Sequence, residues 1–199
     1  MKNKQLLSLL LITLLCCVSC GAKKNVPVAQ KKTVNPFGEA FEAPCTVYDT
    51  PTEFAATGIF KGSMEQKGEV HAAALKNAQD LVRQKMQHAY QGMISGFSST
   101  IGNNRGNDIQ NRMRQAGDQI IDVIVNNTAE SCVKYSGVGD DGMVECYVAI
   151  QISKEETSKQ ITKKVSDVLT EDEKLKIGFD ESEYRKQMDA RFKEYNENR

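Results

Sequence analysis

The chain lacks tryptophan altogether, and aromatic residues make up only 7% of its 199 residues. Proteins that bind bases or sugars by stacking need exposed aromatic rings, so this scarcity argues against a stacking surface. A general excess of positive charge is also missing, because 26 lysines and arginines balance 26 aspartates and glutamates. A balanced chain creates no field that attracts nucleic acid. The composition therefore predicts no nucleic-acid partner.

Histidine is scarce too, and the usual catalytic motifs are missing. His71 and His88 fall on one predicted helix and point about 100° away from each other, so they cannot bind the same metal ion. Neither has a Cys, Asp or Glu three or four residues away that would complete a ligand pair. The chain contains no GxSxG, HExxH or phosphate-loop motif. These gaps predict a protein that is not an enzyme and that holds no metal or cofactor.

Three of the six cysteines, Cys45, Cys132 and Cys146, lie outside the N-terminal region. If the two strands around Gly139 form a symmetric hairpin, Cys132 and Cys146 stand opposite each other and can form a disulfide. Cys45, on a short strand predicted nearby, is the competing partner. All three can equally stay reduced and buried, because a free cysteine behaves as a small hydrophobe. No CxxC pair links them, which argues against a redox function.

What the chain does have is one apolar run, residues 6–15, close to its start. Lys2 and Lys4 precede the run, and the small residues Val18 and Ser19 follow shortly after it. A basic start, an apolar stretch and small residues in this order are typical of an export signal. The run is too short for a permanent membrane span, which needs about 20 apolar residues.

The residues Val18, Ser19 and Cys20 resemble the lipobox of bacterial lipoproteins, although Cys17 stands where that family usually has leucine. In such proteins the cysteine is acylated, with palmitate among its chains, and becomes the mature N-terminus. The resemblance therefore implies a signal peptide over residues 1–19 and a lipidated Cys20 that holds the protein at the membrane. An ordinary cleaved signal, which would release the protein into the periplasm, is the alternative.

Residues 20–43 predict a lipidated, flexible tether, because they show no helical or strand period and contain two prolines. In lipoproteins of related bacteria, acidic residues just after the anchor often signal display on the cell surface. The stretch from Gly21 to Lys24 contains no acid. We therefore expect an outer-membrane lipoprotein whose domain faces the periplasm.

The rest of the chain predicts an α+β domain over residues 44–169 and a charged helical segment over residues 170–199. The expected elements are a strand at 54–60, amphipathic helices at 69–94 and 109–125, and a hairpin of strands at 131–135 and 143–152. Together they predict a small antiparallel sheet packed by a long helical hairpin, with additional charged C-terminal helices.

Single positions sharpen this expectation. Gly58, inside the first strand, suggests the close approach of a helix or a β-bulge. Leu81 falls on the apolar arc of the long helix, and Lys85 interrupts that arc with a stem expected to run outward. Thr170 and Glu173 have the spacing of a capping box. A narrow apolar stripe on the last helix is expected to cover the domain itself: Tyr184, Met188, Phe192 and Tyr195.

Residues 54–152 are similar to the periplasmic lipoproteins typed on the twenty-kilodalton surface lipoprotein of a gastric pathogen. The matching pieces are residues 55–58, the alanines at 72–74 and 78, and the strand at 145–150. The second long helix and the charged C-terminal helices depart from that family. The resemblance implies an α+β domain with helices packed on one sheet. The family has no known biochemical function, so the resemblance supplies no catalytic residues.

Anchor, tether and missing catalytic motifs together predict a lipid-anchored cell-envelope protein that binds or scaffolds another envelope protein. One alternative is a periplasmic module that binds a small ligand or peptide, which needs an open pocket lined by Phe54, Phe60, Tyr184 or Phe192. A more remote alternative is an enzyme of unfamiliar type. That alternative needs a cleft that gathers one of the two histidines with carboxylates or a thiol.

Overall fold

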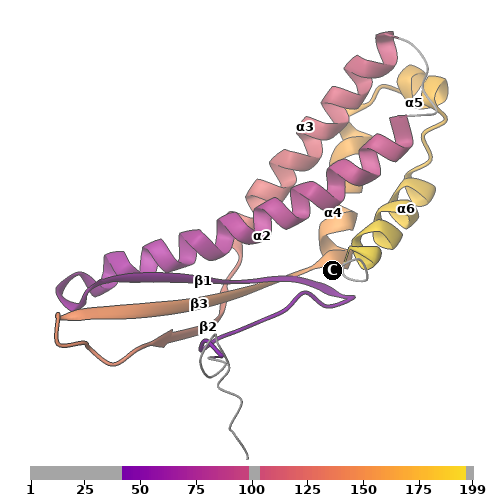
Figure 1. The fold of residues 1–199 in the computed structure, drawn as a ribbon. Helices are drawn as coiled ribbons and strands as arrows, with labels where there is room; N and C mark the ends of the chain where they lie inside the picture. The colour runs from indigo at the N-terminus through magenta and orange to yellow at the C-terminus, as the bar shows by residue number, and fades with distance from the viewer. Residues whose placement is uncertain (1–41, 99–103, 196–199) are drawn as a thin grey trace, which may run out of the picture. The chain divides into compact units, whose positions relative to one another are not determined.

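The structure is a computed structural model, and it describes residues 42–98 and 104–195. The predicted signal peptide, Cys20 and nearly all of the predicted tether lie outside these residues. The described part of the chain is one compact α+β unit, in which a small sheet lies beside a helical bundle (Figure 1). No described helix is long and apolar enough to span a membrane.

The sheet has three antiparallel strands, and the predicted α+β class is confirmed. The strands are β1 (Glu53–Ser63), β2 (Glu130–Tyr135) and β3 (Met143–Ser153), in the order β1-β3-β2. Tyr147 and Ala149 of β3 are buried on one face of the sheet, and a larger set is buried on the other: Val144, Cys146, Val148, Ile150 and Ile152. Because β3 is central, β1 and β2 are both edge strands.

Helix α2 (Lys67–Ser98) packs its first half on one face of the sheet and extends beyond it with its second half (Figure 1). Small residues allow this close packing. A Cβ atom on Gly58 would lie 2.1 Å from the Ala74 carbonyl oxygen and 2.3 Å from the Ala78 backbone nitrogen. The predicted close approach of a helix to Gly58 is therefore confirmed, and α2 lies directly over β1.

A helical bundle forms around the second half of α2. Its other members are α3 (Asn104–Asn127), α4 (Lys154–Val168) and α6 (Glu181–Glu194). The stripe of α6 packs into the bundle as predicted, with Tyr184, Met188 and Phe192 at most 1% exposed. The charged C-terminal segment therefore contributes to the main core rather than standing apart from it.

The short helix α5 (Glu171–Ile177) connects α4 to α6 and starts with the predicted capping box between Thr170 and Glu173. Gly178 ends α5 with a left-handed backbone, at φ 61°, which glycine adopts without steric cost. The capping hydrogen bonds and the neighbouring Arg112 guanidinium lower the pKa of the Glu173 carboxyl to about 2. The Glu173 carboxylate therefore stays ionised at neutral pH and keeps capping the first turn of α5.

The sheet face opposite α2 is crossed by the segment that precedes β1, and a disulfide holds this segment in place. The disulfide joins Cys45 to Cys132, with Cα atoms 5.6 Å apart, and Cys146 remains a buried free thiol. The favoured pairing of Cys132 with Cys146 is therefore wrong, and the competing partner Cys45 is the correct one. The segment around Cys45 also forms no strand, contrary to expectation.

The register of the hairpin explains the error. Tyr135, not Cys132, stands opposite Cys146, and Cys132 stands opposite Ala149. Cys132 therefore points to the face opposite α2, whereas Cys146 points toward α2. Two cysteines on opposite faces of a sheet cannot form a bridge, but Cys45 crosses the face on which Cys132 lies.

Candidate functional site

The described residues leave two adjoining hollows along one side of α2. The larger, about 500 Å³, lies between α2 and the end of α6, and its lining residues are Leu81, Gln84, Lys85, His88, Ala89, Arg191, Glu194 and Tyr195. The smaller, about 400 Å³, lies between α2 and β1, and its lining residues are Thr57, Ile59, Asn77, Asp80, Leu81 and Gln84. Leu81 and Gln84 line both hollows, so together these form one elongated groove, here named the α2 groove.

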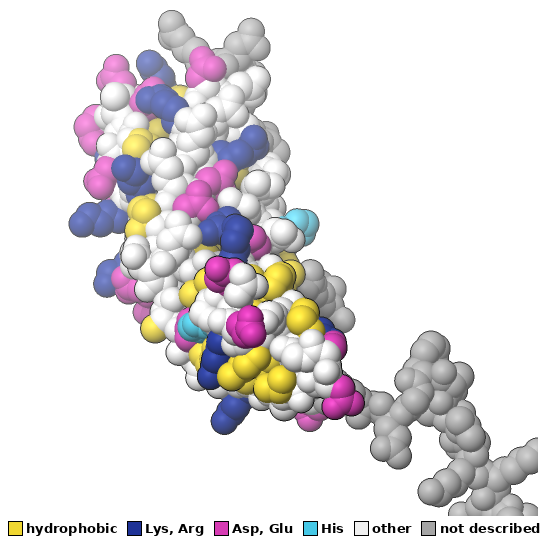
Figure 2. All heavy atoms as spheres, turned by 90° about the vertical axis from the view of Figure 1, so that its left-hand side faces the viewer, with side chains coloured by type: hydrophobic (Ala, Val, Ile, Leu, Met, Phe, Trp, Pro, Cys, Tyr) yellow, Lys and Arg dark blue, Asp and Glu magenta, His cyan; other side chains and the backbone are white. Residues whose placement is uncertain are grey.

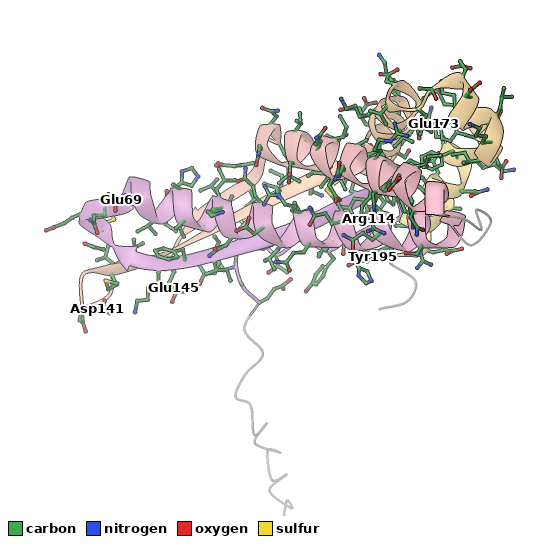
Figure 3. All side chains as sticks on the ribbon, turned by 90° about the horizontal axis from the view of Figure 1, so that it is seen from above. Glu69, Arg114, Asp141, Glu145, Glu173 and Tyr195 are labelled. Atoms are coloured by element: carbon green, nitrogen blue, oxygen red, sulfur yellow. A yellow bond between two sulfur atoms is a disulfide. The ribbon has the colours of Figure 1, made fainter. Side chains whose placement is uncertain are left out.

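Helical spacing builds the wall of the α2 groove. Asn77, Leu81, Gln84 and His88 recur every three or four residues, so they share one side of α2. That side faces past the outer edge of β1 instead of facing the sheet. Leu81, expected on the buried arc, is 45% exposed for this reason. The far end of the groove is closed by Tyr195, which lies beside the second half of α2 (Figure 3).

Lys85 joins α2 to the edge of β1. Its Nζ atom lies 3.0 Å from a carboxylate oxygen of Asp49 and donates to the Ala55 carbonyl oxygen at 2.5 Å. The Ala55 N–H donates to the same carboxylate at 2.8 Å. Lys85 therefore binds acceptors across the strand edge, whereas the sequence predicted only an outward-running stem. A lysine on the apolar arc was the one signal of this site in the sequence.

Lys154 adds a second cation near Asp49. Its side chain is buried, its Nζ lies 4.8 Å from the centre of the Phe54 ring, and it has no hydrogen-bond partner among the described residues. Burial lowers the pKa of Lys154 because the charged form loses its hydration. Asp49 opposes this shift, and Lys85 adds to it by repulsion. Two lysines thus lie near one carboxylate, and of these three side chains Lys85 lines the α2 groove.

At the other end of the groove, the carboxylate of Asp80 is neutralised by neighbouring cations. Asp80 lies 3.2 Å from Lys76 Nζ and 2.6 Å from the Arg83 guanidinium. The hydrogen bond from Lys76 is the main reason that the pKa of Asp80 is lowered. Asp80 is therefore ionised and already paired, so the β1 end of the groove presents mainly apolar and amide groups.

The pocket predicted from the aromatic residues does not form, because three of them fill the core. Phe54, Tyr184 and Phe192 are at most 1% exposed, and the Phe54 and Phe192 ring centres lie 5.1 Å apart. Burial raises the pKa of Tyr184, and the Tyr184 and Tyr90 hydroxyl oxygens lie 3.3 Å apart inside the bundle. Only Phe60, 42% exposed, reaches the surface. The prediction of a ligand pocket lined by these aromatic residues is therefore wrong.

The two histidines have different surroundings. His71 Nε2 lies 2.9 Å from a Glu130 carboxylate oxygen, a pairing between α2 and β2 that sequence spacing cannot reveal. Cys146 lies in the same region, but it is fully buried, and burial raises the pKa of its thiol. His71 lines neither hollow. His88 lines the α2 groove together with Glu194, and its ring centre lies 6.0 Å from that of Tyr195.

Residues 42–98 and 104–195 bring together no group of three or more His, Cys, Asp or Glu side chains that could hold a metal ion. Cys20, the predicted lipidation site, is not among them. No protein-family model, no curated protein and no solved structure matches the chain. The resemblance to the twenty-kilodalton lipoprotein family therefore stays a prediction, and the α2 groove is the candidate site on structural grounds alone.

Proposed function

We propose that the protein is a lipid-anchored cell-envelope protein whose α+β domain binds another molecule in the α2 groove. Cys20 would hold it in the outer membrane with the domain on the periplasmic side, as the lipobox resemblance implies. The binding role covers a scaffold for an envelope protein and a peptide-binding module, because an elongated groove suits a segment of chain. Catalysis has no part in this proposal.

The α2 groove is the observation that carries the proposal. Its hollows, about 500 and 400 Å³, lie within the usual size range of ligand sites. Its lining combines exposed apolar side chains with the charged side chains of α6, a mixture typical of sites that hold an amphipathic ligand. Leu81 and Ile59, each 45% exposed, give the groove an apolar centre that water solvates poorly.

The anchor is tested by labelling growing cells with radioactive palmitate. The wild-type chain is expected to carry the label, and Cys20→Ala is expected to lose it completely because the acylated side chain is gone. Cys17→Ala is the matched control and should keep the label. Label retained by Cys20→Ala would contradict the proposed anchor, and label lost from both variants would show that the whole segment is misprocessed.

Binding in the groove is tested by placing a photo-crosslinking benzoylphenylalanine at position 81 in intact cells. We expect ultraviolet light to give a discrete cross-linked product, because Leu81 lies at the centre of the groove. The same group at position 123 is the control, because Val123 is 53% exposed on α3 and lines neither hollow. Equal products from both positions, or none from position 81, would contradict binding in the groove.

A further inference from the structure

We propose that the outer edge of β1, residues 57–61, binds an extended peptide as an added strand, and that an acidic side chain of the peptide reaches the Lys85 end of the α2 groove. This inference rests on the proposed binding function and specifies the occupant of the same groove. The occupant is a segment of a partner protein in extended conformation, with no helix covering it.

The register of the sheet shows which backbone groups of β1 face outward. Pairing with β3 is continuous from Glu53 to Ser63. The Ala55 N–H donates away from β3 to Asp49, and the Ile59 carbonyl accepts from the Asn77 amide at 2.9 Å. The odd-numbered residues of β1, to which Ala55 and Ile59 belong, therefore direct both their N–H and their C=O groups to the outer edge.

The outward groups before residue 57 are already paired within the chain. The Thr50 N–H donates to the Glu53 carbonyl, and the Glu53 N–H donates to the Thr50 hydroxyl, both at 2.9 Å. From Thr57 to Lys61 the Ile59 carbonyl is the one outward backbone group with a partner among the described residues. That partner is a surface amide, which an incoming strand can displace. A row of unpaired backbone groups is a template for strand addition.

The apolar end of the α2 groove lies directly beside this free edge. Thr57 and Ile59 form one side of the smaller hollow and Leu81 forms the other. A strand paired with β1 would place one side chain in this hollow, on the α2 side of the sheet and against the exposed part of Leu81. Figure 2 faces the end of the sheet at which β1 passes into α2 and shows hydrophobic side chains gathered there. Phe60 and Met64, both more than 40% exposed, are near this end.

A second copy of the chain cannot use the same edge. Helix α2 lies directly over β1, as the contact of Gly58 with Ala74 shows. Two copies paired through β1 would bring their strands to about 4.8 Å and their covering helices to a similar separation. Packed helices need about 8–10 Å between their axes. The edge therefore accepts a bare strand and rejects symmetric pairing with the β1 edge of a second copy.

Charge at the far end of the groove favours an acidic peptide. Lys85 lines the groove and pairs with Asp49, and the buried Lys154 lies near the same carboxylate, so amines outnumber carboxylates here. Glu194 does not change this balance, because it already lies 3.6 Å from the Arg191 guanidinium. A carboxylate on the peptide would complete the balance, whereas a lysine there would be repelled.

The test begins with the full-length chain in detergent, which is offered to a phage-displayed library of short random peptides. We expect enriched peptides to alternate apolar and polar residues and to end in Asp or Glu. For the enriched peptide, Ile59→Pro should weaken binding at least about tenfold, because it removes an outward N–H and no bond to β3. Ile59→Val keeps both the N–H and the apolar side chain, so it should weaken binding less than about threefold.

A second arm leaves the protein unchanged, so it does not depend on how a variant folds. The enriched peptide is N-methylated at alternate residues, in each of the two possible phases. One phase should lose binding at least about tenfold and the other should bind nearly as before, because only alternate N–H groups face β1. Equal effects of both phases, enrichment of helical peptides, or no enrichment would overturn strand addition. A cross-linked product from position 81 would still support binding in the α2 groove in those cases. Strand addition and the proposed function can therefore fail independently of each other.

Discussion

Replacing Cys45 and Cys132 together by alanine should lower the free energy of unfolding by about 4 kcal/mol. The bridge closes a loop of 87 residues, and restricting so long a loop in the unfolded chain is the main stabilising effect in the chain-entropy account. The bridge also holds the segment that covers the sheet face opposite α2, where Ala55 and Ala149 are fully buried. Urea unfolding followed by circular dichroism measures the change.

The control for this prediction is a reducing agent added to the wild-type protein. Reduction should lower the unfolding midpoint of the wild type by nearly as much as the double substitution does, and should leave the double variant unchanged. Mass mapping of unreduced peptides should link Cys45 to Cys132 and leave Cys146 free. A peptide linking Cys132 to Cys146, or a wild-type midpoint insensitive to reduction, would contradict the structure.

Substituting Gly58→Ala should lower the free energy of unfolding by about 3 kcal/mol, because the new methyl group would overlap the backbone of α2. The methyl carbon would lie 2.1 Å from the Ala74 carbonyl oxygen, and backbone atoms cannot move aside as the tip of a flexible side chain can. The helix must therefore shift away from the sheet and lose packing along its first half. Urea unfolding again provides the measurement.

Gly68→Ala is the matched control, since it makes the same change near the start of α2. A Cβ atom on Gly68 would meet no atom of the described residues within 4 Å. Alanine also favours a helix over glycine, so this substitution should leave stability unchanged or raise it by less than about 1 kcal/mol. Similar losses from both variants would show that α2 does not lie on Gly58 as closely as the structure has it.

Local pattern was sufficient for most of the elements, although the short strand predicted around Cys45 does not form. Apolar residues at every second position of β3 indicated one buried face, because side chains on a strand point to alternate faces. Tyr147 and Ala149, on the other face, are buried as well, which this alternation does not show. The capping box at Thr170 and the end of α5 at Gly178 were equally readable, because each depends on a few neighbouring residues. The stripe on α6 predicted its buried face in the same way.

The disulfide could not be predicted, because it depends on where the hairpin turns. The turn is formed by residues 139–142, and the glycine with positive φ, at 72°, is Gly142. Gly139, assumed to be the centre, is the first residue of that turn. This displacement changes the face on which Cys132 lies relative to Cys146. The sequence contains glycines at both positions, so only the folded hairpin shows where the turn forms.

The sequence by itself determined the α+β class, the long amphipathic helix and the burial of the α6 stripe, because periodicity acts within one element. Only the tertiary structure decided the disulfide partner and the α2 groove. The groove arises because α2 lies over an edge strand, so that one side of the helix extends past the sheet and leaves Leu81 and Lys85 beside the free edge of β1. Spacing along a helix shows which residues share a side, but the neighbouring elements decide whether that side is core or surface.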